Sequence, residues 1–222
     1  MANTFQPLAC PHEGSDLRLA GHPRAHAHLP RLGHRGPAPP GPRTSTAADI
    51  ISAIDVERLD APGVDADATL HRETYYSAFT DATLDPDLAD ALYEVEADAT
   101  FNPFATDAAP TLKTLHDNGI RIGILSDIHF DLRPAFDGLP VDSFVLSFEH
   151  GVAKPDPAIF RIALAELGTS PEETLMVGDR ATHDGAAVNV GMPTLLVPPL
   201  RSVDDARLHL VTNLMVANAS NR

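Results

Sequence analysis

The sequence predicts an α/β protein built around a Rossmann-like parallel sheet with flanking helices. From residue 106 onward, short apolar runs alternate with segments of helical periodicity, which is the order of elements in a parallel sheet. Before that point, residues 44–105 show helical periodicity alone, and the first 43 residues show neither period. We therefore expect an irregular or disordered segment at 1–43, a small helical unit at 44–105 and an α/β core at 106–222.

The composition limits the kinds of partner that this protein can have. A net charge of −15 argues against nucleic acid or an anionic membrane surface as the main partner. The sequence contains neither an apolar run of transmembrane length nor the basic start and apolar stretch of a secretory signal. Cys10 is the single cysteine, so no internal disulfide can form. We expect a cytoplasmic protein that binds neither nucleic acid nor membrane, and its oligomeric state is unknown.

Residues 1–43 differ in composition from the rest of the chain. They hold five arginines and two acids, a net charge of +3, whereas residues 44–222 hold 11 basic and 29 acidic residues, a net charge of −18. They also contain 8 of the 20 prolines, which remove backbone donors and interrupt both helices and strands. One hypothesis is that a shifted reading frame or a displaced start site produced this segment. Upstream DNA that encodes no apolar strand ending in Asp-x-Asp in any frame would contradict that hypothesis.

Residues 44–105 are expected to form helices. Four apolar residues in the first part follow a helical spacing, namely Ile50, Ile51, Ile54 and Leu59. Two further helical segments are separated near Asp85-Pro86. The second of them has three apolar residues that should face a core, Leu88, Leu92 and Val95.

Four strands and three helices are expected in the core. The predicted strands are the apolar runs at residues 120–127, 143–148, 174–179 and 193–199. The predicted helices cover residues 108–118, 154–168 and 183–191. Asp107 can cap the first helix, Pro155 suits the first turn of the second, and Gly119 and Gly168 can end them. Ligands of such sheets bind beyond the carboxyl ends of the strands.

Three groups of polar residues fall at those strand ends or in the loops beside them. Ser126 and Asp127 follow the first strand, where a hydroxyl and backbone N–H groups can hold a phosphate oxygen. Lys154 precedes a helix, so its charge would lie beside the positive end of the helix dipole. Asp179 and Asp184 flank the loop after the third strand, and their hard oxygen ligands suit Mg²⁺. Taken singly, each group also fits a turn, surface or helix-cap residue.

Taken together and in this order, "ILSD", "KPDPAIF" and "VGDRATHDG" resemble the haloacid dehalogenase (HAD) superfamily of hydrolases. The resemblance implies that Ser126 and Lys154 are catalytic, that Ser126, Asp127 and Lys154 bind phosphate, and that Asp179 and Asp184 hold Mg²⁺. It also implies that residues 44–105 are the helical cap of the family. Because the last motif looks like the phosphatase type and not the dehalogenase type, we expect Mg²⁺-dependent phosphoester hydrolysis of a small phosphorylated metabolite.

The nucleophile of that family is not visible in the sequence. The family pattern places an apolar strand ending in Asp-x-Asp before the cap, and this strand lies at the centre of the sheet. Asp16 follows no apolar strand, and Asp55 with Glu57 lies in a helical pattern. The central first strand is therefore predicted to be missing or replaced, and the nucleophile is unknown. Three functions stay open: a phosphatase by descent with impaired activity, a non-catalytic protein that binds Mg²⁺ and phosphate, and an interaction module.

Overall fold

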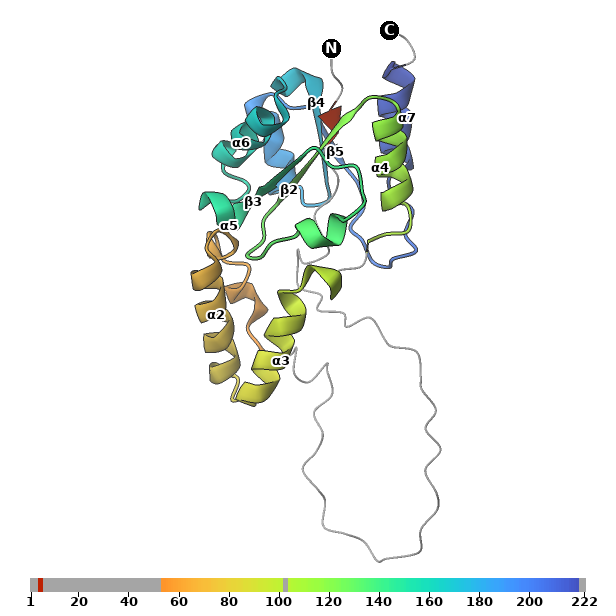
Figure 1. Cartoon of the computed structure of the whole chain (residues 1–222). Coiled ribbons are helices and arrows are strands. Elements are labelled where there is room, and N and C mark those ends of the chain that lie inside the picture. Colours follow the sequence, from red (N-terminus) through yellow and green to blue (C-terminus); the bar gives the residue numbers. More distant parts are fainter. Residues whose placement is uncertain (1–3, 6–52, 102–103, 220–222) are drawn as a thin grey trace, which may run out of the picture.

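The computed structural model describes residues 4–5, 53–101 and 104–219, and it confirms the expected α/β fold (Figure 1). Five parallel strands form a sheet in the order β3-β2-β1-β4-β5. The strands are β1 Thr4–Phe5, β2 Arg121–Ser126, β3 Ser143–Leu146, β4 Thr174–Gly178 and β5 Thr194–Leu196. Because every described neighbour pair is parallel, the carboxyl ends of the strands meet at one edge of the sheet.

Helices cover both faces of this sheet (Figure 1). On one face, α4 Ala108–Asp117 packs beside α7 His209–Ala219. On the other face lie α6 Pro157–Leu167 and the 3-10 helix η6 Asp184–Val190, which takes the place of the α-helix predicted at 183–191. Shorter helices stand in the connections: η4 Arg133–Phe136, α5 Ser147–His150 and η5 Pro171–Glu173. The result is a three-layer arrangement with the sheet in the middle.

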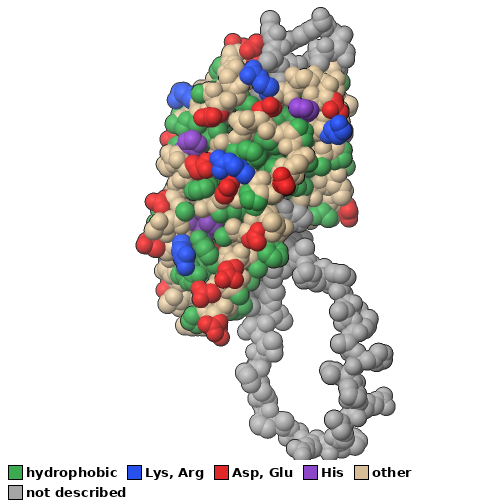
Figure 2. All heavy atoms as spheres, viewed as in Figure 1, with side chains coloured by type: hydrophobic (Ala, Val, Ile, Leu, Met, Phe, Trp, Pro, Cys, Tyr) green, Lys and Arg blue, Asp and Glu red, His purple; other side chains and the backbone are tan. Residues whose placement is uncertain are grey.

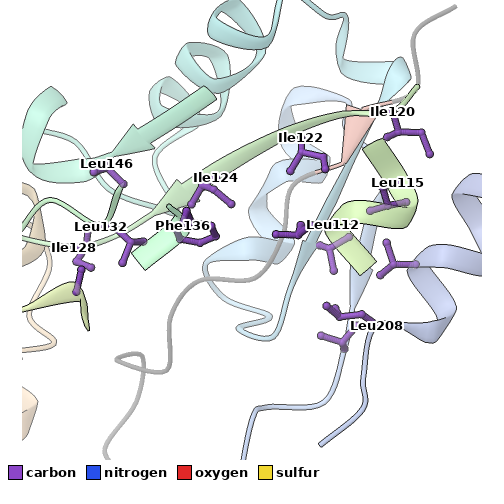
Figure 3. Packing of buried hydrophobic residues seen from close by; sticks show 14 of the residues in the cluster. Leu112, Leu115, Ile120, Ile122, Ile124, Ile128, Leu132, Phe136, Leu146 and Leu208 are labelled. Atoms are coloured by element: carbon purple, nitrogen blue, oxygen red, sulfur yellow. The ribbon is translucent and has the colours of Figure 1, made fainter. Parts of the chain in front are cut away.

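Alternate residues of β2 enter the two halves of the core. Ile122 and Ile124 belong to the larger apolar cluster, which includes residues of α4 such as Leu115 (Figure 3). Leu125 belongs to the second cluster, which includes Phe160 of α6. All five side chains are almost fully buried. This alternation is the two-residue period of a strand covered on both faces, and it holds the carboxyl end of β2 in place.

The centre of the sheet is formed by the two-residue strand β1. Thr4 pairs with Arg121 and Thr174, and Phe5 pairs with Ile122 and Leu175. A short segment therefore stands where the sequence predicts a missing or replaced strand. Apart from this strand, the predicted irregular segment 1–43 lies outside the described residues, as do Ile50 and Ile51.

A second group of helices lies below the sheet in Figure 1. It consists of η1 Val56–Arg58, η2 Val64–Ala66, α2 Ala68–Asp81, α3 Pro86–Glu96 and η3 Ala99–Phe101. Helices α2 and α3 pack around a small apolar cluster with the buried members Ile54, Tyr75, Ala78, Phe79 and Ala89. We refer to this group as the helical unit.

The predicted core face of α3 is wrong at one position. Val95 is 39% exposed, whereas Ala89, Leu92 and Tyr93 pack into the cluster of the helical unit. Positions i, i+3 and i+4 share one stripe of a helix, and a residue six positions along lies about 120° away from it. The face of α3 that packs against α2 is therefore rotated about the helix axis relative to the predicted face.

The predicted helix ends are partly correct. Gly119 and Gly168 follow α4 and α6 with φ angles of 72° and 62°, a left-handed conformation that glycine adopts without strain. Pro155, however, does not lie in the first turn of α6. That helix begins at Pro157, after Asp156. The Asp156 side chain accepts a backbone N–H of the first turn, so the start of α6 is fixed by the second proline of "KPDP".

Acidic side chains are spread over the face shown in Figure 2, including the end formed by the helical unit. This distribution agrees with the net charge of −15. Within the described ranges, no helix has the length and apolar character needed to cross a membrane.

Asp107 links two helices that are far apart in the sequence. It precedes α4 as predicted, but its side chain does not cap that helix. Its Oδ2 atom instead accepts hydrogen bonds from the backbone N–H groups of Arg207 and Leu208. The start of α4 is thereby tied to the segment that leads into α7.

We expect Asp107→Ala to lower the free energy of unfolding by about 1–3 kcal/mol, because two backbone donors lose a charged acceptor. The matched control is Asp117→Ala at the other end of α4. Asp117 forms an exposed ion pair with Lys113, a contact worth at most about 0.5 kcal/mol. Urea unfolding of both variants measures the difference. Equal losses would contradict the proposed link between α4 and α7.

Candidate active site

The structure brings the sequence-predicted site residues to one edge of the sheet. Ser126 is the last residue of β2, and Asp127 follows it. Asp179 follows β4, and Asp184 is the first residue of η6. Strands β2 and β4 both pair with β1, so their carboxyl ends are separated by one strand position. Buried strands position Ser126, Asp127 and Asp179, so local apolar patterns were enough to predict that these residues lie at strand ends.

Lys154 is the centre of this cluster. Its Nζ atom lies 2.6 Å from Oδ1 of Asp184 and 3.9 Å from Oδ2 of Asp127. Its backbone N–H donates to Oδ1 of Asp127 at 2.8 Å. The side chains of all three residues are at least 96% buried. One lysine thus connects the loop after β2 with the start of η6.

The carboxylate of Asp184 lies beneath the end of β4. Its Oδ2 atom accepts the backbone N–H groups of Asp179 and Arg180, each at 2.9 Å. A Cβ atom at Gly178 would lie 2.2 Å from both Cγ and Oδ2 of Asp184. Only glycine at position 178 leaves room for this carboxylate.

Asp179 is paired with a cation that the sequence did not reveal. Its Oδ2 atom lies 3.2 Å from Nη1 of Arg207, whose side chain is 6% exposed. Arg207 also donates to the carbonyl oxygen of Pro198. A signal was available in the sequence, because Leu208, Val211 and Met215 follow a helical spacing and are buried. That pattern predicts α7, although not the ion pair with Asp179.

Several atoms of this site could receive a ligand. Oδ2 of Asp127 is buried and accepts no hydrogen bond from the described residues. Ser126, at the end of β2, is almost fully buried. Asp127, Asp179 and Asp184 supply hard oxygen donors of the kind that Mg²⁺ prefers. The chemistry of these donors suits a divalent cation, and Asp179 is the most exposed of the three carboxylates.

His183 stands beside Asp184 at the rim of the cluster. Its Nε2 atom lies 3.1 Å from Nη2 of Arg180. Burial and the positive charge of Arg180 lower the pKa of His183. The imidazole is therefore expected to be neutral at neutral pH, leaving the positive charges of the site to lysine and arginine.

The candidate nucleophiles are not brought to the cluster by the described part of the chain. Asp55 is exposed and precedes η1 in the helical unit. Asp16 lies outside the described residues. The described strand between β2 and β4 contains Thr4 and Phe5 and carries no acid.

Comparisons with known proteins agree with this fold. The family model of the haloacid dehalogenase-like hydrolases matches residues 14–191. A glyceraldehyde 3-phosphate phosphatase from Pyrococcus furiosus is 35% identical over 99 residues, which is 40% of this chain and 39% of that protein. A glyceraldehyde 3-phosphate phosphatase from Methanopyrus kandleri is 36% identical over 97 residues, 41% of this chain and 42% of that one. The chain thus spans about two fifths of the length of these curated relatives.

Among solved structures, a dehalogenase matches with a TM-score of 0.51 and 25% sequence identity, over 61% of this chain and 69% of that chain. The family match covers well over half of the sequence and includes both the helical unit and the cluster at the strand ends. The chain belongs to the haloacid dehalogenase-like hydrolases.

Proposed function

We propose that this chain is a phosphatase-type member of the family that acts on a small phosphorylated metabolite with Mg²⁺. The observation that carries the proposal is the buried cluster of Asp127, Lys154 and Asp184 at the carboxyl edge of the sheet. The two relatives described above are named for a small phosphorylated aldehyde, which supports the same class of substrate. In this proposal the helical unit is the cap over the site.

Each residue of the cluster has a role in this proposal. The Ser126 hydroxyl and the backbone N–H of Asp127 would bind oxygens of the phosphate group, and Lys154 would neutralise its charge. Asp179 and Asp184 would hold Mg²⁺, which when bound neutralises charge on the phosphoryl oxygens. Lys154 already holds Asp184, so it would also orient that carboxylate. We assign no nucleophile.

A second candidate function is binding of Mg²⁺ and a phosphorylated ligand without turnover. It is favoured by one observation: the described part of the central strand holds Thr4 and Phe5 and no acid. Loss of a covalent nucleophile lowers the rate by several orders of magnitude, whereas the phosphate and cation ligands could still bind.

Hydrolysis of an aryl phosphate by the full-length protein separates the two candidates. If the first is right, turnover requires Mg²⁺, stops with a chelator and falls at least about 100-fold in Asp179→Asn. Asp204→Asn, which changes an exposed acid, should retain full activity. Calorimetric binding of Mg²⁺ and inorganic phosphate without turnover would support the second candidate. The absence of both binding and turnover would contradict both candidates.

Gly178→Ala should disrupt the cluster because the added Cβ would overlap the Asp184 carboxylate. We expect the free energy of unfolding to fall by about 1–3 kcal/mol and Mg²⁺ binding to weaken. Gly185→Ala is the matched control, since a Cβ there meets no atom within 4 Å. It should change stability by no more than about 0.5 kcal/mol. Thermal unfolding with and without Mg²⁺ measures both effects, and unaltered Mg²⁺ binding in Gly178→Ala would contradict the proposed place of Asp184.

Arg207 should compete with a cation for Asp179. Replacing it in Arg207→Met removes a positive charge 3.2 Å from the carboxylate. We expect Mg²⁺ affinity to rise roughly fivefold, equivalent to ~1 kcal/mol. Arg201→Met, which changes an exposed arginine, is the control, and isothermal calorimetry is the measurement. Weaker binding in Arg207→Met would show instead that Arg207 orients Asp179 for the cation.

A further inference from the structure

Four titratable side chains meet between the helical unit and the sheet domain, outside the cluster described above. Asp65 comes from η2, His71 from α2 and Glu96 from the last position of α3. His129 comes from the loop after β2, two residues beyond Asp127. Both histidines are buried, at 3% and 6% exposure. Residues from three elements of the helical unit thus converge on one residue of the core.

The potential ligand atoms of this group lie close to one another. Nε2 of His71 lies 3.8 Å from Oδ1 of Asp65 and 3.8 Å from Oε1 of Glu96. Nδ1 of His129 lies 3.9 Å from the same oxygen of Asp65. One ligand atom from each of Asp65, His71 and His129 lies within 4.8 Å of the others. These separations are too long for hydrogen bonds.

The separations are instead close to those around a bound metal ion. With bonds of about 2.1 Å, neighbouring ligands of a tetrahedral Zn²⁺ lie about 3.4 Å apart. The observed distances of 3.8 and 3.9 Å would have to shorten by roughly half an ångström. Two imidazoles with one or two carboxylates form a mixed nitrogen and oxygen donor set, which suits Zn²⁺ and similar first-row metals more than Mg²⁺.

A buried hydroxyl fixes the backbone on both sides of this group. Ser147, the first residue of α5, has no exposed surface. Its Oγ atom accepts the backbone N–H of Ile128 at 2.7 Å and donates to the carbonyl oxygen of Asp65 at 2.6 Å. Asp65 and the neighbour of His129 are therefore held against the same side chain. This framework satisfies the need of a metal site for ligands on a positioned backbone.

Electrostatics also favours a cation at this place. Burial, together with the charge of Asp127, raises the pKa of Asp65 to about 6. Burial, together with the charge of Asp65, raises the pKa of Glu96 to about 7. The charge of Asp65 therefore destabilises the charged form of Glu96, and the charge of Asp127 destabilises that of Asp65. A divalent ion would neutralise both charges and the field of Asp127 beside them.

We propose that Asp65, His71 and His129 bind a transition-metal ion of the Zn²⁺ type that joins the helical unit to the core, with Glu96 as the fourth ligand. The two imidazole rings stack with their centroids 3.4 Å apart and their planes 7° from parallel. Lone pairs in two parallel rings cannot both point at one ion midway between them. Metal binding therefore requires the rings to tilt apart. The proposal is independent of the phosphatase function, because it uses neither Asp179 nor Asp184.

The test uses the full-length protein, stripped of metal with a chelator and titrated with Co²⁺. With excess Mg²⁺ present to fill the oxygen-ligand site proposed above, one equivalent should bind and give the visible absorption of Co²⁺ in a nitrogen and oxygen site. Zn²⁺ should displace it, and excess Mg²⁺ should not. His71→Gln and His129→Gln should each weaken Zn²⁺ binding at least about tenfold, measured by competition with an indicator dye.

Several controls locate the bound ion. His116→Gln changes an exposed histidine of α4 and should bind Zn²⁺ normally. A variant with glutamine at His26, His28 and His34 tests the histidines of the N-terminal segment, and Asp179→Asn tests the candidate active site. Both should retain the absorption of bound Co²⁺. If either abolishes it while His71→Gln does not, the proposal is wrong.

A variant less prone to misfolding guards against loss of structure in the histidine variants. The Asp65 side chain is 28% exposed, and Asp65→Asn keeps its shape while removing its charge. It should retain the circular dichroism of the native protein and still weaken Zn²⁺ binding at least about tenfold. Native-like Zn²⁺ binding by folded Asp65→Asn, or no binding by the unchanged protein, would overturn the proposal.

Discussion

The carboxyl edge of the sheet depends on the buried ion pair between Lys154 and Asp184. Isolated charges at this depth would be strongly unfavourable, so neither residue can be placed there without the other. The pair also has hydrogen-bond partners on both sides. Asp184 accepts the backbone N–H groups that follow β4, and the Lys154 backbone donates to Asp127 after β2. Two strand ends and the approach to α6 are thereby held in one arrangement.

This arrangement also determines the charge that a ligand would meet. Asp184 is paired with Lys154, Asp179 is paired with Arg207, and Asp127 lies 3.9 Å from the shared lysine. Within these pairs the three acids exceed the two cations by one negative charge, and Arg180 adds a positive charge at the rim of the site. A divalent cation would reverse that balance and make the same edge attractive to a phosphate group. Binding of the two ligands is therefore expected to be cooperative.

Local sequence patterns were sufficient for the parts of the site that lie at strand ends. An apolar run fixes where a strand ends, so Ser126 and Asp179 could be placed from their neighbours alone. The partners of these residues could not, because Arg207 reaches Asp179 from 28 positions away and no periodicity encodes such an encounter. The group around His129 was missed for the same reason, since Asp65, His71 and Glu96 approach it only when the helical unit docks. The exposed Val95 shows that prediction also has a limit within one helix, because the spacing of apolar residues in α3 was compatible with two adjacent buried faces.

The ion pair of Arg207 with Asp179 places the C-terminal helix in contact with the site. Arg207 stands at the entry to α7, and its backbone N–H is held by Asp107 at the start of α4. A cation that draws Asp179 away from Arg207 removes one of the contacts that dock this segment. If cation binding changes the docking equilibrium of α7 by a certain factor, then undocking of α7 changes the cation affinity of Asp179 by the same factor. Substitutions in α7 can therefore alter ligand binding although none of them touches the ligand.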